Sequence, residues 1–463
     1  MTPAATRAPR SKTAVILLLA ATAVAGAALL TPRRGAPASL VDAVAPDAVS
    51  VSARATSSHV LRGTSETHIA ITLRAPDLAH RGARPPAALA IVIDRSGSMT
   101  GAPLAHAKAA AQRLIDQLEA YDRFAVVTYS TGAEMLAPTR AATPDAKAAA
   151  RAAIERIAAD GGTNISAGLR LGADALDDGD GERVRRVVLI SDGQANEGIY
   201  DRQGLSDLAA DTAARGASIT SVGVGLDFDE RTMTAIAVAG RGQYYFVEDF
   251  GQLATLFDRE LEGLGAIVAT DAELVVAPAP GVEVLEAYGY RMRADGGTVR
   301  VPVADLEAGA VRKVVLRVRV RADGDKVELA RVQLGWRTRE DRARRTAEAR
   351  VAVAVSDDAG AVLAHRDRDV VRQVEEVQTA RALETAADAY ERGDFEGASR
   401  VLDVRAAEAA RLSLELGDAS IQRQAAQATG AAKAGFAAAP EGGGDAGKRA
   451  LKASRAGAYQ LAH

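Results

Sequence analysis

The feature that most constrains the fold is a pair of apolar runs that each stop at an aspartate. Residues 88–93, Ala-Leu-Ala-Ile-Val-Ile, contain no polar side chain, and Asp94 follows them directly. A second apolar run, residues 187–190, is followed by Ser191 and Asp192. Strands that are apolar throughout are typical of the centre of a parallel sheet, where helices cover both faces. The two runs therefore predict a parallel sheet with an aspartate just beyond two of its central strands.

Residues 87–263 alternate strand-like and helix-like segments around these two runs. Thr143 followed by Pro144 is a typical helix start, because threonine caps the first turn and proline is tolerated there. The alternation predicts an α/β fold with a doubly wound, Rossmann-like and mainly parallel sheet. The expected strands are 88–93, 123–129, 184–190, 218–224 and 243–247, and the expected helices are 103–119, 144–158, 165–177, 203–215, 229–239 and 251–263.

The segments that flank this domain have different patterns. Residues 47–86 and 264–357 alternate apolar and polar residues, and we expect them to pack together as an antiparallel, β-sandwich-like unit. Residues 366–430 are rich in Ala, Glu and Arg and predict a helical region. Residues 33–46, rich in Pro and Ala, are expected to be a linker, and residues 437–463 are expected to be a flexible tail because they combine glycines with basic residues.

The first 32 residues indicate export. Arg7, Arg10 and Lys12 precede an uncharged and mostly apolar run at residues 13–32, as in a signal peptide or a signal anchor. The run is long enough to span a bilayer, so the sequence leaves open whether it is cleaved. We expect the rest of the protein to lie outside the cytoplasm, in the cell envelope, with contact to the membrane only through this segment.

Composition excludes several functional classes. The chain contains no cysteine, which rules out thiol catalysis, disulfides and cysteine-ligated zinc. Its net charge is −3, and no basic stripe is interleaved with aromatic residues, so we expect no nucleic-acid partner.

Three polar stretches are predicted to meet at one edge of the sheet. Asp94, Ser96 and Ser98 follow the first apolar run, and Asp192 follows the second. Thr163 lies between them in sequence, in the stretch Gly-Gly-Thr-Asn that opens a predicted helix. In doubly wound sheets, ligands bind at the carboxyl ends of the strands. Oxygen ligands without histidine or cysteine suit Mg²⁺, Mn²⁺ or Ca²⁺, so the sequence predicts a divalent-metal site, with Mg²⁺ preferred.

The ratio of hydroxyl to carboxylate ligands predicts the role of the metal. Three of the five are neutral hydroxyls and two are carboxylates, so a bound cation keeps residual positive charge. An open or water-filled position can then accept an Asp or Glu side chain from a protein partner through a charge-assisted bond.

These three stretches of the sequence resemble a known family. The stretches Asp94-Arg-Ser-Gly-Ser-Met-x-Gly101, Gly161-Gly-Thr-Asn-Ile-x-x-Gly-Leu169 and Ser191-Asp-Gly-Gln-Ala-Asn196 are similar to the metal-ion-dependent adhesion site of von Willebrand factor type A domains. The resemblance covers about residues 87–262. It implies that Asp94, Ser96 and Ser98 bind the metal, and that Thr163 and Asp192 coordinate it directly or through water. It also implies adhesion or assembly rather than catalysis, as in bacterial envelope proteins of this family.

Alternative functions are less consistent with these residues. Aspartyl-phosphate phosphohydrolases need a second aspartate two residues after the first, but Ser96 occupies that position. A serine hydrolase needs Gly-x-Ser-x-Gly, and the spacing at residues 97–101 differs. A scaffold protein, in which the metal serves only to stabilise the fold, is also consistent with the sequence. We therefore predict a non-enzymatic, metal-dependent binding module and keep the structural role as the alternative.

Overall fold

A computed structural model describes residues 48–77, 86–177, 183–248, 252–338, 341–440, 442 and 444–463. The predicted export segment and linker, residues 1–46, lie outside the described residues. Within the part of the chain that is described, no helix combines the length and apolar character needed to cross a bilayer.

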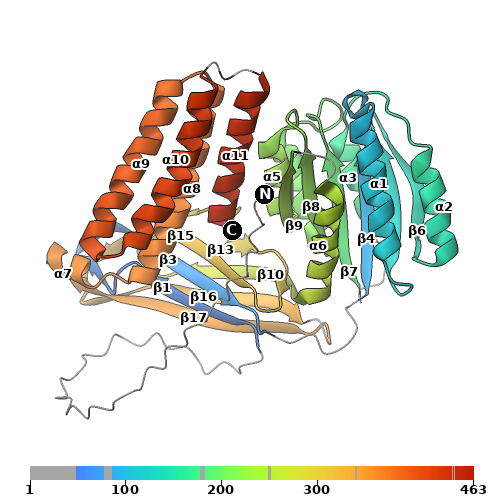
Figure 1. Cartoon of the computed structure of the whole chain (residues 1–463). Coiled ribbons are helices and arrows are strands. Elements are labelled where there is room, and N and C mark those ends of the chain that lie inside the picture. The colour runs from blue at the N-terminus through green and yellow to red at the C-terminus, as the bar shows by residue number, and fades with distance from the viewer. Residues whose placement is uncertain are drawn as a thin grey trace, which may run out of the picture. The chain divides into compact units, whose positions relative to one another are not determined.

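The described residues from 86 to 266 form the predicted α/β domain (Figure 1). The strand order of its sheet is β6-β5-β4-β7-β8-β9, and neighbouring strands are parallel except for β5 and β6. This confirms the doubly wound, Rossmann-like fold. The strands are β4 (Ala87–Asp94), β5 (Arg123–Tyr129), β6 (Ala133–Ala141), β7 (Val184–Ser191), β8 (Ala217–Val224) and β9 (Arg241–Val247).

One strand of this sheet was not among those expected. β6 lies at the sheet edge, pairs antiparallel with β5 and is largely solvent-exposed. Its sequence contains Pro138 and has no regular apolar alternation. Edge strands can tolerate proline because one row of their backbone groups has no strand partner, so periodicity alone does not reveal this strand.

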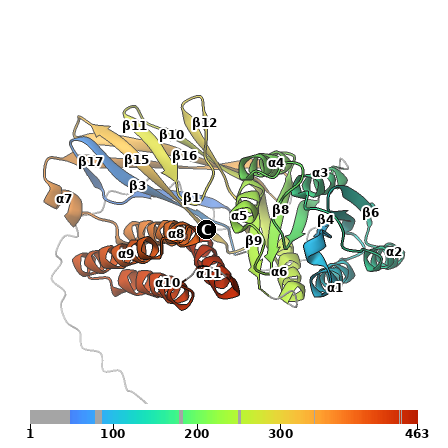
Figure 2. The ribbon, with the colours of Figure 1, turned by 90° about the horizontal axis from the view of Figure 1, so that it is seen from above.

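Helices cover both faces of the sheet (Figure 2). One face carries α1, α2 and α6, which bury Leu114, Ile154 and Phe257 against it. The opposite face carries α3, α4 and α5. This two-sided burial explains why residues 87–93 of β4 are all apolar, since every residue of the strand is buried. The helices are α1 (Ala102–Gln117), α2 (Pro144–Glu155), α3 (Ile165–Ala175), α4 (Arg202–Ala214), α5 (Glu230–Ala239) and α6 (Leu253–Ala266).

The strands before and after the α/β domain form two sheets with a common core. Their strand orders within the described residues are β1-β3-β15-β11 and β12-β13-β10-β16-β17-β2, with β14 paired to β10. Segments from both sides of the α/β domain therefore share one sandwich. The strands are β1 (Ser50–Ala55), β2 (His59–Leu61), β3 (Gly63–Arg74), β10 (Ile267–Pro278), β11 (Val282–Ala287), β12 (Arg293–Asp295), β13 (Thr298–Pro302), β14 (Leu306–Glu307), β15 (Val311–Ala322), β16 (Lys326–Thr338) and β17 (Arg344–Ser356).

Helices follow the sandwich to the end of the chain. Val370, Val374 and Val377 of α8 pack on β3 and β15 through Ala70 and Val315. The helices α8, α9, α10 and α11 bury a core of their own. They are α7 (Ala359–Ala364), α8 (Arg368–Glu391), α9 (Phe395–Leu416), α10 (Ala419–Ala438) and α11 (Gly444–Ala462).

The structure corrects the expectation of a flexible tail. Most of residues 437–463 form α11, which buries Ala450 and Ala458. Of the basic residues that suggested a solvated tail, Lys448, Arg449 and Arg455 form ion pairs with acidic side chains from other elements, and Lys452 donates to the carbonyl of Phe228. These partners are distant in sequence, so local composition could not predict that the segment would dock.

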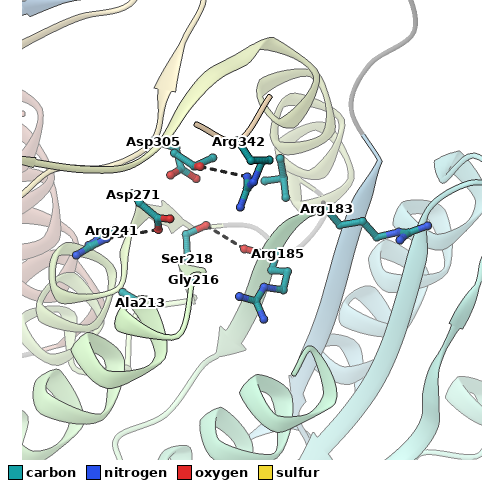
Figure 3. A pocket seen from close by; sticks show the side chains of 11 residues that line it. Arg183, Arg185, Ala213, Gly216, Ser218, Arg241, Asp271, Asp305 and Arg342 are labelled. Atoms are coloured by element: carbon teal, nitrogen blue, oxygen red, sulfur yellow. Dashed lines mark hydrogen bonds and ion pairs between the residues drawn. The ribbon is translucent and has the colours of Figure 1, made fainter. Parts of the chain in front are cut away.

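A polar pocket lies at the amino ends of β7, β8 and β9, the strand ends opposite Asp94 (Figure 3). Among the described residues, the non-glycine residues with left-handed backbone are Arg241, Asp271 and Arg342, and all three line this pocket. Nη1 of Arg241 lies 3.6 Å from Oδ1 of Asp271, and Nη1 of Arg342 donates to Oγ1 of Thr270 over 3.3 Å. These contacts join the α/β sheet to β10 and the loop before β17.

Candidate metal site

The sheet brings the two predicted aspartates to one edge. Asp94 is the last residue of β4, and Asp192 follows the last residue of β7. β4 and β7 are parallel neighbours, with Ile93 opposite Ile190. The two aspartates therefore leave adjacent strands at nearly the same level, where a doubly wound sheet places its ligand site.

A chain of hydrogen bonds joins four of the five predicted residues. The backbone N–H of Ser96 donates to Oδ1 of Asp94 over 2.8 Å. The hydroxyls of Ser96 and Ser98 are 3.1 Å apart. Oγ of Ser98 donates to Oδ1 of Asp192 over 2.8 Å. The structure thus brings Asp94, Ser96, Ser98 and Asp192 into one cluster.

Thr163 borders the same cluster through Gly193. A Cβ atom on Gly193 would lie 3.4 Å from Oγ of Ser98 and 3.5 Å from Oγ1 of Thr163, so both hydroxyls flank this glycine. The loops are tied together by a hydrogen bond of 3.1 Å from the N–H of Gly97 to the carbonyl of Gly161. All five predicted residues therefore lie at the same edge.

Asn196 positions the Thr163 loop through a contact that was not predicted from the sequence. Its Oδ1 accepts a hydrogen bond of 2.8 Å from the N–H of Thr163, and its own N–H donates to the Thr163 carbonyl over 3.1 Å. Asn164 caps α3 by accepting a hydrogen bond from the N–H of Ala167. These two asparagines together fix the start of α3 beside the loop that follows β7.

Two buried side chains orient Asp94, and neither role was predicted from the sequence. Oδ2 of Asp94 accepts a hydrogen bond of 2.8 Å from Oγ of Ser191 and one of 3.1 Å from the hydroxyl of Tyr129. Tyr129 is fully buried. It is paired with Asp94 in the register of β4 and β5. Its position at the carboxyl end of the neighbouring strand is the sequence signal that could have identified it.

The carboxylates are in an environment that penalises their charge. Burial raises the pKa of Asp94, against the opposing effect of its hydrogen bonds from Ser96, Ser191 and Tyr129. Burial also raises the pKa of Asp192 to about 6; the hydrogen bond from Ser98 opposes this shift, and the charge of Asp94 adds to it.

The donor set fits a hard divalent cation. All of its side-chain donors are oxygen atoms, two carboxylates and three hydroxyls, in the class that Mg²⁺ and Mn²⁺ prefer. Ser98 is exposed, whereas Asp94 and Ser96 are buried, so one side of the cluster faces solvent. No group of three or more His, Asp or Glu side chains among the described residues is placed to hold a metal ion. A cation at this edge would therefore rely on hydroxyls as well as on the two carboxylates.

Comparisons with known proteins agree with this fold. The family model of the von Willebrand factor type A domain matches residues 88–259. Residues 88–259 are thus a von Willebrand factor type A domain, carried on a chain with an additional β-sandwich and C-terminal helices.

Among curated relatives, the chain is 32% identical over 216 residues to the uncharacterized protein sll0103 of Synechocystis sp., covering 46% of this chain and 50% of that one. It is 28% identical over 213 residues to the uncharacterized protein YfbK of Escherichia coli, covering 45% of this chain and 37% of that one. The chain therefore spans half or less of the length of these two relatives.

Among solved structures, a von Willebrand factor type A protein from Catenulispora acidiphila aligns with a TM-score of 0.66 at 20% identity. The alignment covers 84% of this chain and 92% of that one. The shared architecture thus extends well beyond the type A domain.

Proposed function

We propose that this protein is a metal-dependent binding or assembly module of the cell envelope. A divalent cation, Mg²⁺ by preference, is held by Asp94, Ser96, Ser98, Thr163 and Asp192, and it accepts a carboxylate from an Asp or Glu of a protein partner. The observation that carries the proposal is the hydrogen-bonded chain from Asp94 through the two serines to Asp192. Similarity to an interaction domain supports it.

The exposure of the site supports a partner rather than an enclosed substrate. Ser98 and Gly97 are exposed at the end of β4, and the loop after β7 carries the exposed residues Asn196 and Tyr200. Tyrosine is enriched in protein interfaces because its ring supplies contact area and its hydroxyl a hydrogen bond. The exposed Tyr200 on the loop that follows Asp192 is therefore consistent with a protein partner.

A structural role for the metal is the second candidate, and the burial of Asp94 favours it. Asp94 has no exposed surface, and among the described residues no lysine or arginine forms an ion pair with it or with Asp192. A bound cation would compensate two buried carboxylates and so stabilise the folded state by mass action. The two roles are compatible, and one pair of measurements separates them.

The test uses the full chain and three readouts, which are metal binding, melting temperature and partner capture. Mn²⁺ and Mg²⁺ binding is measured by calorimetry for the wild type, Asp94→Ala and Asp192→Asn, and the melting temperature is recorded with and without chelator. Crosslinking and pull-down from the native envelope then compare wild type and Asp94→Ala, with and without chelator. Folding that survives chelation together with capture that is lost supports the binding role. Capture that chelation leaves undiminished contradicts the metal bridge.

The absence of catalysis and the export of the chain are also part of the proposal. We expect no phosphatase or esterase turnover on generic substrates, because Ser96 replaces the aspartate that a phosphohydrolase needs. Turnover that disappears in Asp94→Asn would contradict this expectation. Cell fractionation tests localisation, and recovery of the chain from the cytoplasm alone would contradict export by residues 13–32.

A further inference from the structure

Helix α11 is bound to the type A domain through its basic residues. The contacts concentrate on the loop between β8 and α5, which leaves the sheet at the same edge as Asp192. The four basic residues each find a partner: Lys448 with Asp227, Arg449 with Glu248, Lys452 with the carbonyl of Phe228, and Arg455 with Glu391 of α8.

Lys452 contacts both the backbone carbonyl and the aromatic ring of Phe228. Its side chain is buried, with the residue 4% exposed, and Nζ donates to the Phe228 carbonyl over 3.1 Å. Nζ also lies 3.4 Å from the centre of the Phe228 ring. A cation over an aromatic face is attracted more strongly when both are removed from water. One buried ammonium of α11 thus fixes the position of Phe228.

Phe228 packs on β8, the strand next to β7, and Asp192 directly follows β7. A Cβ atom on Gly223 would lie 2.2 Å from a ring carbon of Phe228, so the ring sits directly on the backbone of β8 at this glycine. In the parallel register of β7 and β8, Gly223 is opposite Ser191. Ser191 donates the hydrogen bond of 2.8 Å to Oδ2 of Asp94. A continuous series of contacts therefore runs from α11 to the candidate metal site.

We propose that Lys452 is a positioning residue for the metal site, acting through Phe228 and the end of β8. By holding Phe228 on Gly223, it keeps the end of β7 in place, and with it Ser191 and Asp192. The inference rests on the proposed function. It places a determinant of metal affinity outside residues 88–259, at a position 260 residues after Asp192.

The design of the test must account for Glu230, a buried glutamate whose charge interacts with that of Lys452. Glu230 is 2% exposed, and its Oε1 accepts a hydrogen bond of 2.9 Å from Tyr244, while Oε2 has no hydrogen-bond partner. Removing Lys452 alone would take away the largest favourable charge interaction of this buried carboxylate, which is destabilising. The double variant Lys452→Met with Glu230→Gln removes both charges and keeps the side-chain lengths and the acceptor for Tyr244.

The experiment measures Mn²⁺ affinity by calorimetry on the full chain, and hydrogen exchange without metal. For the double variant we expect Mn²⁺ binding weakened by about threefold or more, since outer contacts tune metal affinity, and faster exchange in residues 190–193 and 223–228. Arg449→Gln is the matched control. It also removes an ion pair between α11 and the type A domain, but at Glu248, and should leave both readouts unchanged.

The outcomes separate the two proposals. A folded double variant with wild-type Mn²⁺ affinity and unchanged exchange at residues 190–193 overturns the positioning role. Wild-type protein that binds no Mn²⁺ overturns the proposed function. If hydrogen exchange at residues 190–193 is then also unchanged in the double variant, the proposed path of contacts from Lys452 through Phe228 to β7 is overturned as well. If the double variant does not fold, Phe228→Leu serves instead, because it removes the ring under Lys452 but keeps the site apolar; the same changes are expected.

Discussion

Ser98 and Asp192 are 94 positions apart in sequence, yet the hydroxyl of Ser98 donates a hydrogen bond of 2.8 Å to the carboxylate of Asp192. Each residue follows a different central strand of the sheet. The contact joins the two halves of the candidate site and lies at its exposed side, where Ser98 meets solvent. It therefore provides the most direct way to test the site without disturbing the buried Asp94.

Replacing Ser98 with alanine should weaken Mg²⁺ and Mn²⁺ binding by about tenfold while leaving the fold intact. The change removes one oxygen donor and the hydrogen bonds of Ser98 with Ser96 and Asp192, each of roughly 1 kcal/mol, at an exposed position. Calorimetric titration with Mn²⁺ measures the loss, and Thr100→Ala, a nearby exposed hydroxyl that bonds only to the Gly97 carbonyl among the described residues, is the control. Equal affinity in wild type and Ser98→Ala would remove Ser98 from the ligand set.

Tyr129→Phe tests whether the hydrogen bond from the Tyr129 hydroxyl orients Asp94 for metal binding. The phenol donates to Oδ2 of Asp94 inside the fully buried core, so its removal leaves that oxygen with one fewer donor. We expect metal affinity to fall about tenfold, as for partners that orient a ligand, and stability to fall by about 1 kcal/mol. Metal titration and urea unfolding measure the two effects. A variant with unchanged metal affinity would limit Tyr129 to a packing role.

Gly223→Ala tests the packing of Phe228 on β8. A methyl group there would overlap the ring, with the nearest carbon 2.2 Å away. We expect a loss of about 1–3 kcal/mol in unfolding free energy, typical of overpacking. Gly132→Ala has nothing within 4 Å of the added methyl and should change stability by less than about 0.5 kcal/mol. Chemical denaturation of both variants checks the prediction, which similar stabilities would contradict.

Arg186→Met should destabilise the protein by about 3–5 kcal/mol, because it leaves a buried carboxylate unpaired. Arg186 and Glu260 are each 4% exposed, and Nη1 of Arg186 donates to Oε2 of Glu260 over 3.0 Å. The double variant with Glu260→Gln should recover part of this loss, because Glu260 is then neutral, whereas Asp305, 3.5 Å from Nη2 of Arg186, still loses this cation. Urea unfolding of the two variants measures the difference. A single variant that is no less stable than the double would refute the unpaired-charge explanation.

The unfolding free energy should fall on acidification because of His68. Burial, with a smaller effect from the charge of Arg317, lowers the pKa of His68 from 6.5 to about 4. A pKa that is lower in the folded state gives stability that is present above pH 6.5 and lost as pH falls through 4. The loss is at most about 3 kcal/mol. Urea unfolding at pH 7 and pH 4.5 should show a smaller decline for His68→Gln than for wild type, and equal declines would exclude His68.

Sequence periodicity and motifs were sufficient for the type A domain and for the placement of the five candidate ligands at one sheet edge. Residues 88–93 of β4 and 187–190 of β7 are apolar because both faces of the sheet are covered, so the two strands were recognisable, and Asp94 and Asp192 close behind these runs marked the edge. β6 was not predicted because an exposed edge strand need not alternate apolar and polar residues. The roles of Tyr129 and Ser191 escaped because they depend on which strands are neighbours, a property of the assembled sheet.

By itself, the sequence determined the fold class and the chemistry of the candidate ligands, because apolar periodicity and oxygen-bearing side chains are local properties. Only the tertiary structure decided which groups orient Asp94, and that residues 444–462 form a docked helix. The physical reason is the same in both cases. A buried hydroxyl or a basic side chain acquires its role from partners far away in the chain, such as Phe228 for Lys452, and such partners become neighbours only when the chain has folded.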